Sequence, residues 1–137
     1  MQRVLLDASF WIALRDPREP WHSRARQATM ELLKNRTLFV FTTLILAETH
    51  AHFCRSRAIS AQVLDDAERN PTLHWEPITR ADESEAVRLL RDHRDKSYSL
   101  CDAISFTLMR RLELNRAAAL DEHFRQFGEF EIIPEHV

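Results

Sequence analysis

The chain has 137 residues, a formal net charge of -2 and 45% hydrophobic residues, so we expect it to fold as one globular domain spanning residues 1–137. Its apolar runs are shorter than the roughly 18 residues that a membrane span needs, and its charge gives no global positive field for nucleic acid. The two cysteines, Cys54 and Cys101, lack a metal-type spacing, which favours free thiols in a reducing cytoplasm. The single glycine, Gly128, excludes the P-loop and the GxGxxG dinucleotide motif, because both need several glycines.

Short apolar runs alternate with segments of helical spacing along the chain. Strands are predicted, in chain order, at Val4–Leu6, Leu38–Thr42, Leu73–Trp75, Ala117–Leu120 and Glu131–Ile133. Helices are predicted between them at Ser9–Leu14, Pro20–Asn35, Thr43–Cys54, Ser60–Asn70, Thr79–Arg91 and Ser99–Leu112, with a short one after Asp121. Strands that alternate with helices predict an α/β fold, in which a mostly parallel sheet is covered on both faces.

Carboxylates recur at or near the ends of the predicted strands. Asp7 and Asp121 close the first and fourth strands, and Glu48 lies on an apolar face of the helix after the second strand. Asp102 falls in the first turn of a helix, within an apolar run. The carboxyl ends of parallel strands meet at one rim of a sheet, where ligands bind at the switch in strand order. We therefore expect these carboxylates to gather there, with Glu48 pointing inward.

Carboxylates that lie close together repel one another, and this repulsion has to be offset. Two carboxylates about 5 Å apart repel by roughly 3 kcal/mol at an effective dielectric constant of about 20. A group of four therefore requires a cation or raised pKa values. Oxygen ligands in this number suit Mg²⁺ or Mn²⁺.

Each carboxylate also has a purely structural interpretation. Ser99 and Asp102 match the S-x-x-[DE] capping box, Asp121 suits the N-cap of the helix that follows it, and Asp7 suits a local Asx turn. Glu48 has no capping task in the middle of its helix, although an ion pair with a nearby arginine would satisfy it. Capping and metal binding are compatible, because a carboxylate has more lone pairs than one cap uses.

The segments that carry these residues resemble the successive motifs of PIN-domain ribonucleases, in particular VapC-type toxins of toxin-antitoxin pairs. The segments are VLLDASFWIAL, TTLILAETHA, SYSLCDAISFTLMRRL and AAALDEHFRQFG, and the resemblance runs from Val4 to about Ile133. It implies a three-layer α/β/α fold with sheet order 3-2-1-4-5. It further implies that Asp7, Glu48, Asp102 and Asp121 bind the metal and that Ser9 and Ser99 line the site. Divalent Mg²⁺ or Mn²⁺, hydrolysis of RNA phosphodiester bonds, a homodimer and a cognate antitoxin protein follow from the same resemblance.

Other residues are weaker candidates. Candidates for binding the RNA backbone are Arg15, Arg55, Lys96 and Arg110. Arg110 suits a solvated ion pair on its helix equally well, and we interpret His123 and His52 as packing, surface or outer-sphere residues rather than metal ligands. The chain departs from the family in two places. Glu122 stands where many relatives have a basic residue. The helix ending near Leu112 lacks the glycine common at that point, and we expect Asn115 to adopt the left-handed turn instead.

Surfaces for partners are less defined. The region around Trp21 is a candidate dimer surface, and the apolar positions between Phe53 and Leu64 are a candidate site for an antitoxin segment.

Two other functions compete with a nuclease. Asp7 after the first strand is typical of phosphatases with a strand-end aspartate nucleophile, but Ser9 replaces their usual second aspartate. The other alternative is a non-catalytic PIN-like module that binds RNA or protein and uses its carboxylates only as caps. Such a module predicts that Asp102→Asn is tolerated in every assay, whereas a nuclease predicts loss of cleavage.

Overall fold

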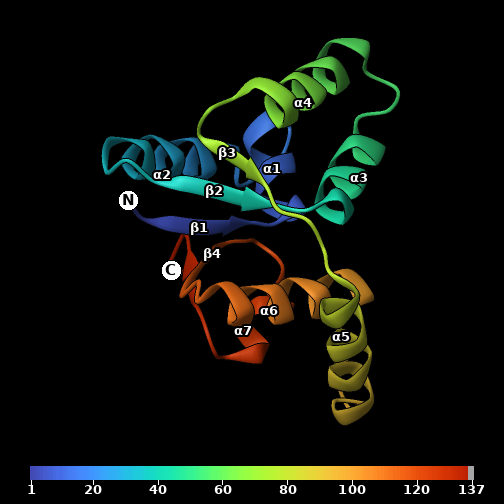
Figure 1. Ribbon diagram of the computed structural model, residues 1–137. Helices are drawn as coiled ribbons and strands as arrows, with labels where there is room; N and C mark the ends of the chain where they lie inside the picture. Colours follow the sequence, from blue (N-terminus) through green and yellow to red (C-terminus); the bar gives the residue numbers. More distant parts are fainter. Residues whose placement is uncertain (136–137) are drawn as a thin grey trace.

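The structure, a computed structural model, describes residues 1–135 and contains one five-stranded sheet of order β3-β2-β1-β4-β5 (Figure 1). All pairings between neighbouring strands are parallel. The strands are β1 (Arg3–Leu6), β2 (Leu38–Phe41), β3 (Leu73–Trp75), β4 (Arg116–Ala118) and β5 (Glu131–Ile133). The expected α/β class and strand order are therefore confirmed.

Helices cover both faces of this sheet. They are α1 (Ala8–Arg15), α2 (His22–Lys34), α3 (Thr43–His52), α4 (Arg57–Arg69), α5 (Arg80–Asp92), α6 (Leu100–Leu112) and α7 (Glu122–Phe127). Figure 1 shows α6 and α7 on the near side of the sheet and α1 and α2 behind it, which gives three layers. Within residues 1–135, no helix is both long and apolar enough to cross a membrane.

The apolar run around Asp102 has a packing explanation. Every residue of α6 from Asp102 to Met109 is buried, because this helix contacts α5 and its apolar residues belong to the core. Phe106 stacks on Phe127 with ring centroids 4.2 Å apart and meets Phe124 edge-on at 4.9 Å. The helix that holds Asp102 is thus fixed on several sides.

Several predicted boundaries differ from the structure by a few residues, and two of these differences have a clear physical cause. The helix expected to start at Ser60 begins one turn earlier, because Ser56 is the N-cap and its hydroxyl accepts the N–H of Ile59 at 3.3 Å. The fourth strand ends at Ala118 rather than Leu120, because the N–H of Leu120 donates to the side chain of Ser9 and not to a neighbouring strand.

The left-handed turn after α6 was also assigned to the wrong residue. Glu113, rather than Asn115, has a positive φ of 56° and forms the C-cap. Its N–H donates to the carbonyl of Arg110, and the N–H of Leu114 then donates to that of Met109. The turn is needed immediately after the last helical residue, and a non-glycine residue adopts it there at a modest cost.

Candidate active site

Asp7 leads from β1 into α1 and is almost completely buried, with 5% of its surface exposed. It caps α1: its Oδ2 accepts the N–H of Ser9 at 3.1 Å and the hydroxyl of Ser9 at 2.5 Å. Burial raises the pKa of Asp7 to about 6, the bonds from Ser9 oppose this, and the charges of Asp102 and Asp121 raise it further. The predicted Asx-type turn and the predicted crowding of carboxylates therefore occur at the same residue.

Ser9 joins the start of α1 to the end of β4. Its Oγ accepts the N–H of Leu120 at 2.9 Å and the N–H of Asp121 at 3.3 Å, while its hydroxyl hydrogen goes to Asp7. Because β1 pairs with β4, with Leu6 opposite Ala118, the residues that follow the two strands are neighbours. The expected proximity of Asp7 and Asp121 is confirmed, and one hydroxyl organises it.

Asp102 comes to the same rim from α6. The predicted capping box is present: the Oγ of Ser99 accepts the N–H of Asp102 at 3.0 Å, and the N–H of Ser99 donates to Asp102 Oδ2 at 3.0 Å. Asp121 caps α7 by accepting the N–H of His123 at 2.9 Å. Both carboxylates thus act as caps and still face one another across His123.

His123 lies between these two aspartates. Its Nδ1 is 2.7 Å from Oδ2 of Asp102 and 3.4 Å from Oδ1 of Asp121, and its side chain is 23% exposed. Ligand atoms of Asp102, Asp121 and His123 all lie within 4.8 Å of one another. We had interpreted His123 as a packing or surface residue, so its position inside the carboxylate group corrects that interpretation.

Glu48 approaches from α3 but is not inward as we had expected. It is exposed, because Ile45, Leu46 and Thr49 are the residues of α3 that fill the core. Its carboxylate nevertheless accepts a hydrogen bond from the thiol of Cys101. Burial, this hydrogen bond and the charges of Glu48, Asp7 and Asp102 together raise the pKa of Cys101 well above its usual range. Cys101 therefore lies between Glu48 and the aspartates as a neutral thiol.

The donor set fits a divalent cation. Asp7, Asp102 and Asp121 converge from β1, α6 and the end of β4. The pKa of Asp7 is raised mainly by its burial and further by the charges of Asp102 and Asp121, so these carboxylates are close enough to affect one another. Carboxylate oxygens in this number, with one imidazole beside them, are ligands that Mg²⁺ and Mn²⁺ accept. Ser9 and Ser99 hold two of these carboxylates in fixed orientations.

The basic candidates lie in different settings. Arg15 forms an ion pair with Asp66 of α4 at the far end of α1 from Asp7. Arg110 makes a double hydrogen bond to Glu129, at 2.7 and 2.8 Å, which matches its ion-pair interpretation. Nζ of Lys96 lies 3.7 Å from Oδ2 of the exposed Asp95. Arg55 is exposed in the turn between α3 and α4.

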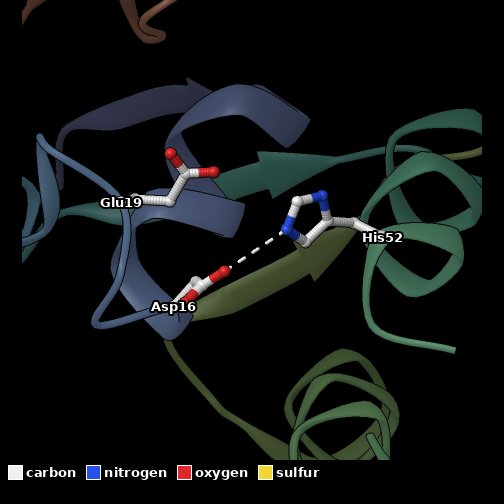
Figure 2. A group of neighbouring side chains, drawn as sticks. All are labelled: Asp16, Glu19 and His52. Atoms are coloured by element: carbon white, nitrogen blue, oxygen red, sulfur yellow. Dashed lines mark hydrogen bonds and ion pairs between the residues drawn. The ribbon is translucent and has the colours of Figure 1, made fainter. Parts of the chain in front are cut away.

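A second group of titratable side chains, separate from Asp7, Asp102 and Asp121, connects the end of α1 to α3. Nε2 of His52 is 3.4 Å from Oδ2 of Asp16, and Figure 2 shows Glu19 beside them. The carboxylate of Asp16 is already occupied by Arg18, which donates to it from its backbone N–H at 3.0 Å and from Nε at 3.2 Å. These bonds lower the pKa of Asp16. His52 therefore belongs to an ion-pair group at the end of α1.

The candidate partner surfaces are partly covered within the chain. The guanidinium of Arg24 lies 4.9 Å from the ring centroid of Trp21. Phe53 is 3% exposed and belongs to the core, whereas Leu64 is 42% exposed on α4. Of the apolar positions between Phe53 and Leu64, Ala58, Ala61 and Leu64 on α4 are therefore exposed.

Comparison with known proteins gives consistent matches over most of the chain. The family model described as PIN domain matches residues 4–129. The chain is 31% identical over 134 residues to the curated protein named 23S rRNA-specific endonuclease VapC20 from Mycobacterium tuberculosis, with 96% of this chain and 99% of the relative covered.

Solved structures agree with this match. The crystal structure of VapC20 from Mycobacterium tuberculosis, described as a Sarcin-Ricin loop cleaving toxin, has a TM-score of 0.84 and 25% identity and covers 96% of this chain and 99% of that one. VapBC2 from Rickettsia felis, bound to a promoter DNA fragment, has a TM-score of 0.69 and 11% identity, with 96% and 97% covered. FitAcB from Neisseria gonorrhoeae has a TM-score of 0.67 and 13% identity, with 94% and 95% covered. The last two show the fold alone.

Proposed function

Because the chain belongs to the PIN-domain family, we propose that it is a divalent-metal-dependent endoribonuclease that acts as the toxin of a toxin-antitoxin pair, with one PIN domain spanning residues 1–137. The observation that carries this proposal is the group of Asp102, Asp121 and His123 at one rim of the sheet, with Asp7 joined to it through Ser9. The 31% identity to an endonuclease over nearly its whole length supports it.

The residues of the chain divide the work at this site. Asp7, Asp102 and Asp121 hold the cation, Glu48 faces the group from α3, and Ser9 and Ser99 keep two of the carboxylates oriented. Mg²⁺ or Mn²⁺, when bound, polarises the scissile phosphate and lowers the pKa of the attacking water. The buried setting of Asp7 strengthens its attraction for the cation, because little water competes with that interaction.

We propose ribosomal RNA as the substrate class. The relative named above is described as specific for 23S rRNA, and its crystal structure is that of a Sarcin-Ricin loop cleaving toxin. Contacts to the RNA backbone are proposed for Arg15, Arg55, Lys96 and Arg110. Arg55 and Lys96 are exposed, while Arg15 and Arg110 would have to exchange their present acidic partners for phosphate.

Partners and location follow from the family resemblance. We propose a homodimer, a cognate antitoxin and a cytoplasmic site of action. Free thiols at Cys54 and Cys101 are consistent with a reducing compartment. Leu64 is a large apolar residue exposed on α4, in the segment proposed to contact the antitoxin.

The test is cleavage of 23S rRNA, transfer RNA and messenger RNA by the antitoxin-free chain in Mg²⁺ or Mn²⁺, with EDTA as the metal-free arm. We expect metal-dependent cleavage of 23S rRNA that Asp102→Asn abolishes. Asp95→Asn is the matched control, because Asp95 is an exposed carboxylate shortly before α6 and should leave cleavage unchanged. RNA binding without cleavage, unaffected by Asp102→Asn, would favour the non-catalytic module instead.

A further inference from the structure

We propose that His123 is a nitrogen ligand of the divalent cation, beside Asp102 and Asp121, and that it shifts the preference of the site from Mg²⁺ towards Mn²⁺. This inference rests on the proposed function, because it concerns the metal of the same site. It adds a residue that the carboxylate pattern does not include.

The spacing of the donor atoms suits one ion. In octahedral coordination with bonds of about 2.1 Å, neighbouring ligand atoms are about 3.0 Å apart. Nδ1 of His123 is 2.7 Å from Asp102 Oδ2 and 3.4 Å from Asp121 Oδ1, so the two observed separations bracket that value. Small rotations of these side chains therefore bring three donors to adjacent coordination positions.

The ring is also oriented as a ligand should be. Nδ1 faces the aspartates and donates its proton to Asp102 Oδ2 at 2.7 Å, while Nε2 lies 3.2 Å from the hydroxyl of Ser97. A cation would take the place of that proton, and the ring would then donate its other N–H to Ser97, as metal-bound histidines usually do to a neighbouring acceptor. Tyr98 holds the ring edge-on at 5.6 Å, and Tyr98 is itself buried against Phe106 at 5.4 Å.

One short segment therefore organises two ligands. Ser97 and Tyr98 position His123, and Ser99 positions Asp102 through the capping box. The backbone N–H of His123 is meanwhile fixed by Asp121. His123 is thus held by contacts that do not depend on a metal.

The imidazole predicts a preference among cations. Mg²⁺ favours oxygen ligands and keeps several of its waters, whereas imidazole nitrogen is a better ligand for transition metals. A nitrogen donor therefore adds more to the affinity for Mn²⁺ than to the affinity for Mg²⁺. Without His123 the difference between the two affinities should narrow.

The test uses Mn²⁺ alone as a spectroscopic probe on the full chain. Electron spin echo envelope modulation detects a nitrogen bound directly to Mn²⁺, and we expect that signal in the unmodified protein. His123→Ala should abolish it and weaken Mn²⁺ binding at least about tenfold, with a loss of less than about threefold for Mg²⁺. His74→Ala is the control, because it removes an exposed imidazole on β3 and should leave the signal intact.

The outcomes separate this inference from the proposed function. Bound Mn²⁺ without nitrogen coupling in the unmodified protein, combined with metal-dependent RNA cleavage, overturns the role of His123 and leaves the nuclease intact. A nitrogen signal that persists in His123→Ala also overturns it. Failure of the unmodified chain to bind Mn²⁺ overturns both proposals. Ser97→Ala keeps the imidazole and should retain the coupling with weaker binding, so the test does not depend on one variant.

Discussion

At the scale of single residues, Asp7 is a buried acid whose environment favours its neutral form. Its pKa of about 6 in the folded protein compares with an ordinary value of 3.8. Below about pH 4 the carboxyl is protonated in both the folded and the unfolded chain, and its burial has no effect on stability. As the pH rises from about 4 to about 6, the unfolded chain releases the proton of Asp7 before the folded chain does, so the metal-free protein loses stability.

Asp7→Asn should therefore stabilise the metal-free protein, or leave it unchanged, at neutral pH. The difference between 3.8 and about 6 corresponds to about 3 kcal/mol, which is the largest gain expected near pH 7. The gain should vanish near about pH 4. Urea unfolding in EDTA at the two pH values measures it, and added Mn²⁺ should stabilise the unmodified chain but not the variant. If the variant were clearly less stable at neutral pH and still stabilised by Mn²⁺, that result would contradict the proposal that Asp7 is one of several crowded carboxylates that bind the metal.

Ser9→Ala should cost both stability and cleavage. The substitution removes the acceptor for the N–H groups of Leu120 and Asp121 and the donor to Asp7. Leaving partly buried polar groups without partners costs about 1–3 kcal/mol. Thermal unfolding and the RNA assay measure the two effects, with Ser84→Ala on the exposed face of α5 as the control. Equal stability of the two variants would show that the hydroxyl bridge contributes nothing.

The sequence predicted some of these residues and missed others for a physical reason. Asp7 and Asp121 follow strands, and strand ends of a parallel sheet meet at one rim, so their proximity follows from pattern alone. His123 and Cys101 enter the site through side-chain rotamers and through the packing of Tyr98 and Glu48 around them. Neither depends on hydrophobic periodicity, so no pattern of that kind identifies them.

At the scale of elements, one ion pair fastens α5 to α6. Nε and Nη2 of Arg111 donate to the two carboxylate oxygens of Asp82 at 2.8 and 2.9 Å. Asp82 is 2% exposed and also closes the capping box of α5 with Thr79. Its burial alone would raise its pKa, but the bonds from Arg111 and Thr79 outweigh this and lower it. The stability that Asp82 contributes is therefore present near neutral pH and is lost in acid.

Arg111→Ala should destabilise the protein by roughly 1–3 kcal/mol, because it leaves a buried carboxylate with fewer donors. Arg110→Ala is a close control, since Arg110 is the preceding residue and pairs with the exposed Glu129, and exposed pairs contribute about 0–1 kcal/mol. Thermal unfolding of both variants at neutral pH compares them. A larger loss from Arg110→Ala would contradict the assignment of Asp82 and Arg111 as the fastening pair.

Capping explains which element boundaries the sequence predicted. The boxes at Thr79 and Ser99 have the expected spacing of a hydroxyl and an acid, and both helices begin where the pattern indicated. Ser60 also resembled a cap, but Ser56 takes that position one turn earlier. When two serines lie one turn apart, tertiary packing decides between them, and here Ile59, whose N–H Ser56 caps, packs against the core.

At the scale of the whole molecule, charge opposes binding of RNA in the absence of metal. The chain has a net charge of -2 and concentrates several carboxylates at the rim where the substrate would lie. We expect Mn²⁺ to raise the affinity for RNA at least about tenfold, or 1.4 kcal/mol. Fluorescence anisotropy with a non-cleavable RNA analogue, in EDTA and in Mn²⁺, measures this, and Asp102→Asn should remove the increase. Equal affinity in both conditions would mean that basic side chains alone hold the RNA.

The bond from the backbone N–H of Asp121 to Ser9 spans 112 residues of sequence, and it has a consequence for the time at which the activity arises. Ribosomes synthesise Asp7 and Ser9 early and the segment after β4 more than a hundred residues later. Until that segment has emerged, the growing chain has neither Asp121 nor His123 with which to complete the site. We therefore expect cleavage activity to arise only in the last part of translation, and chains interrupted before Asp121 should be inactive fragments.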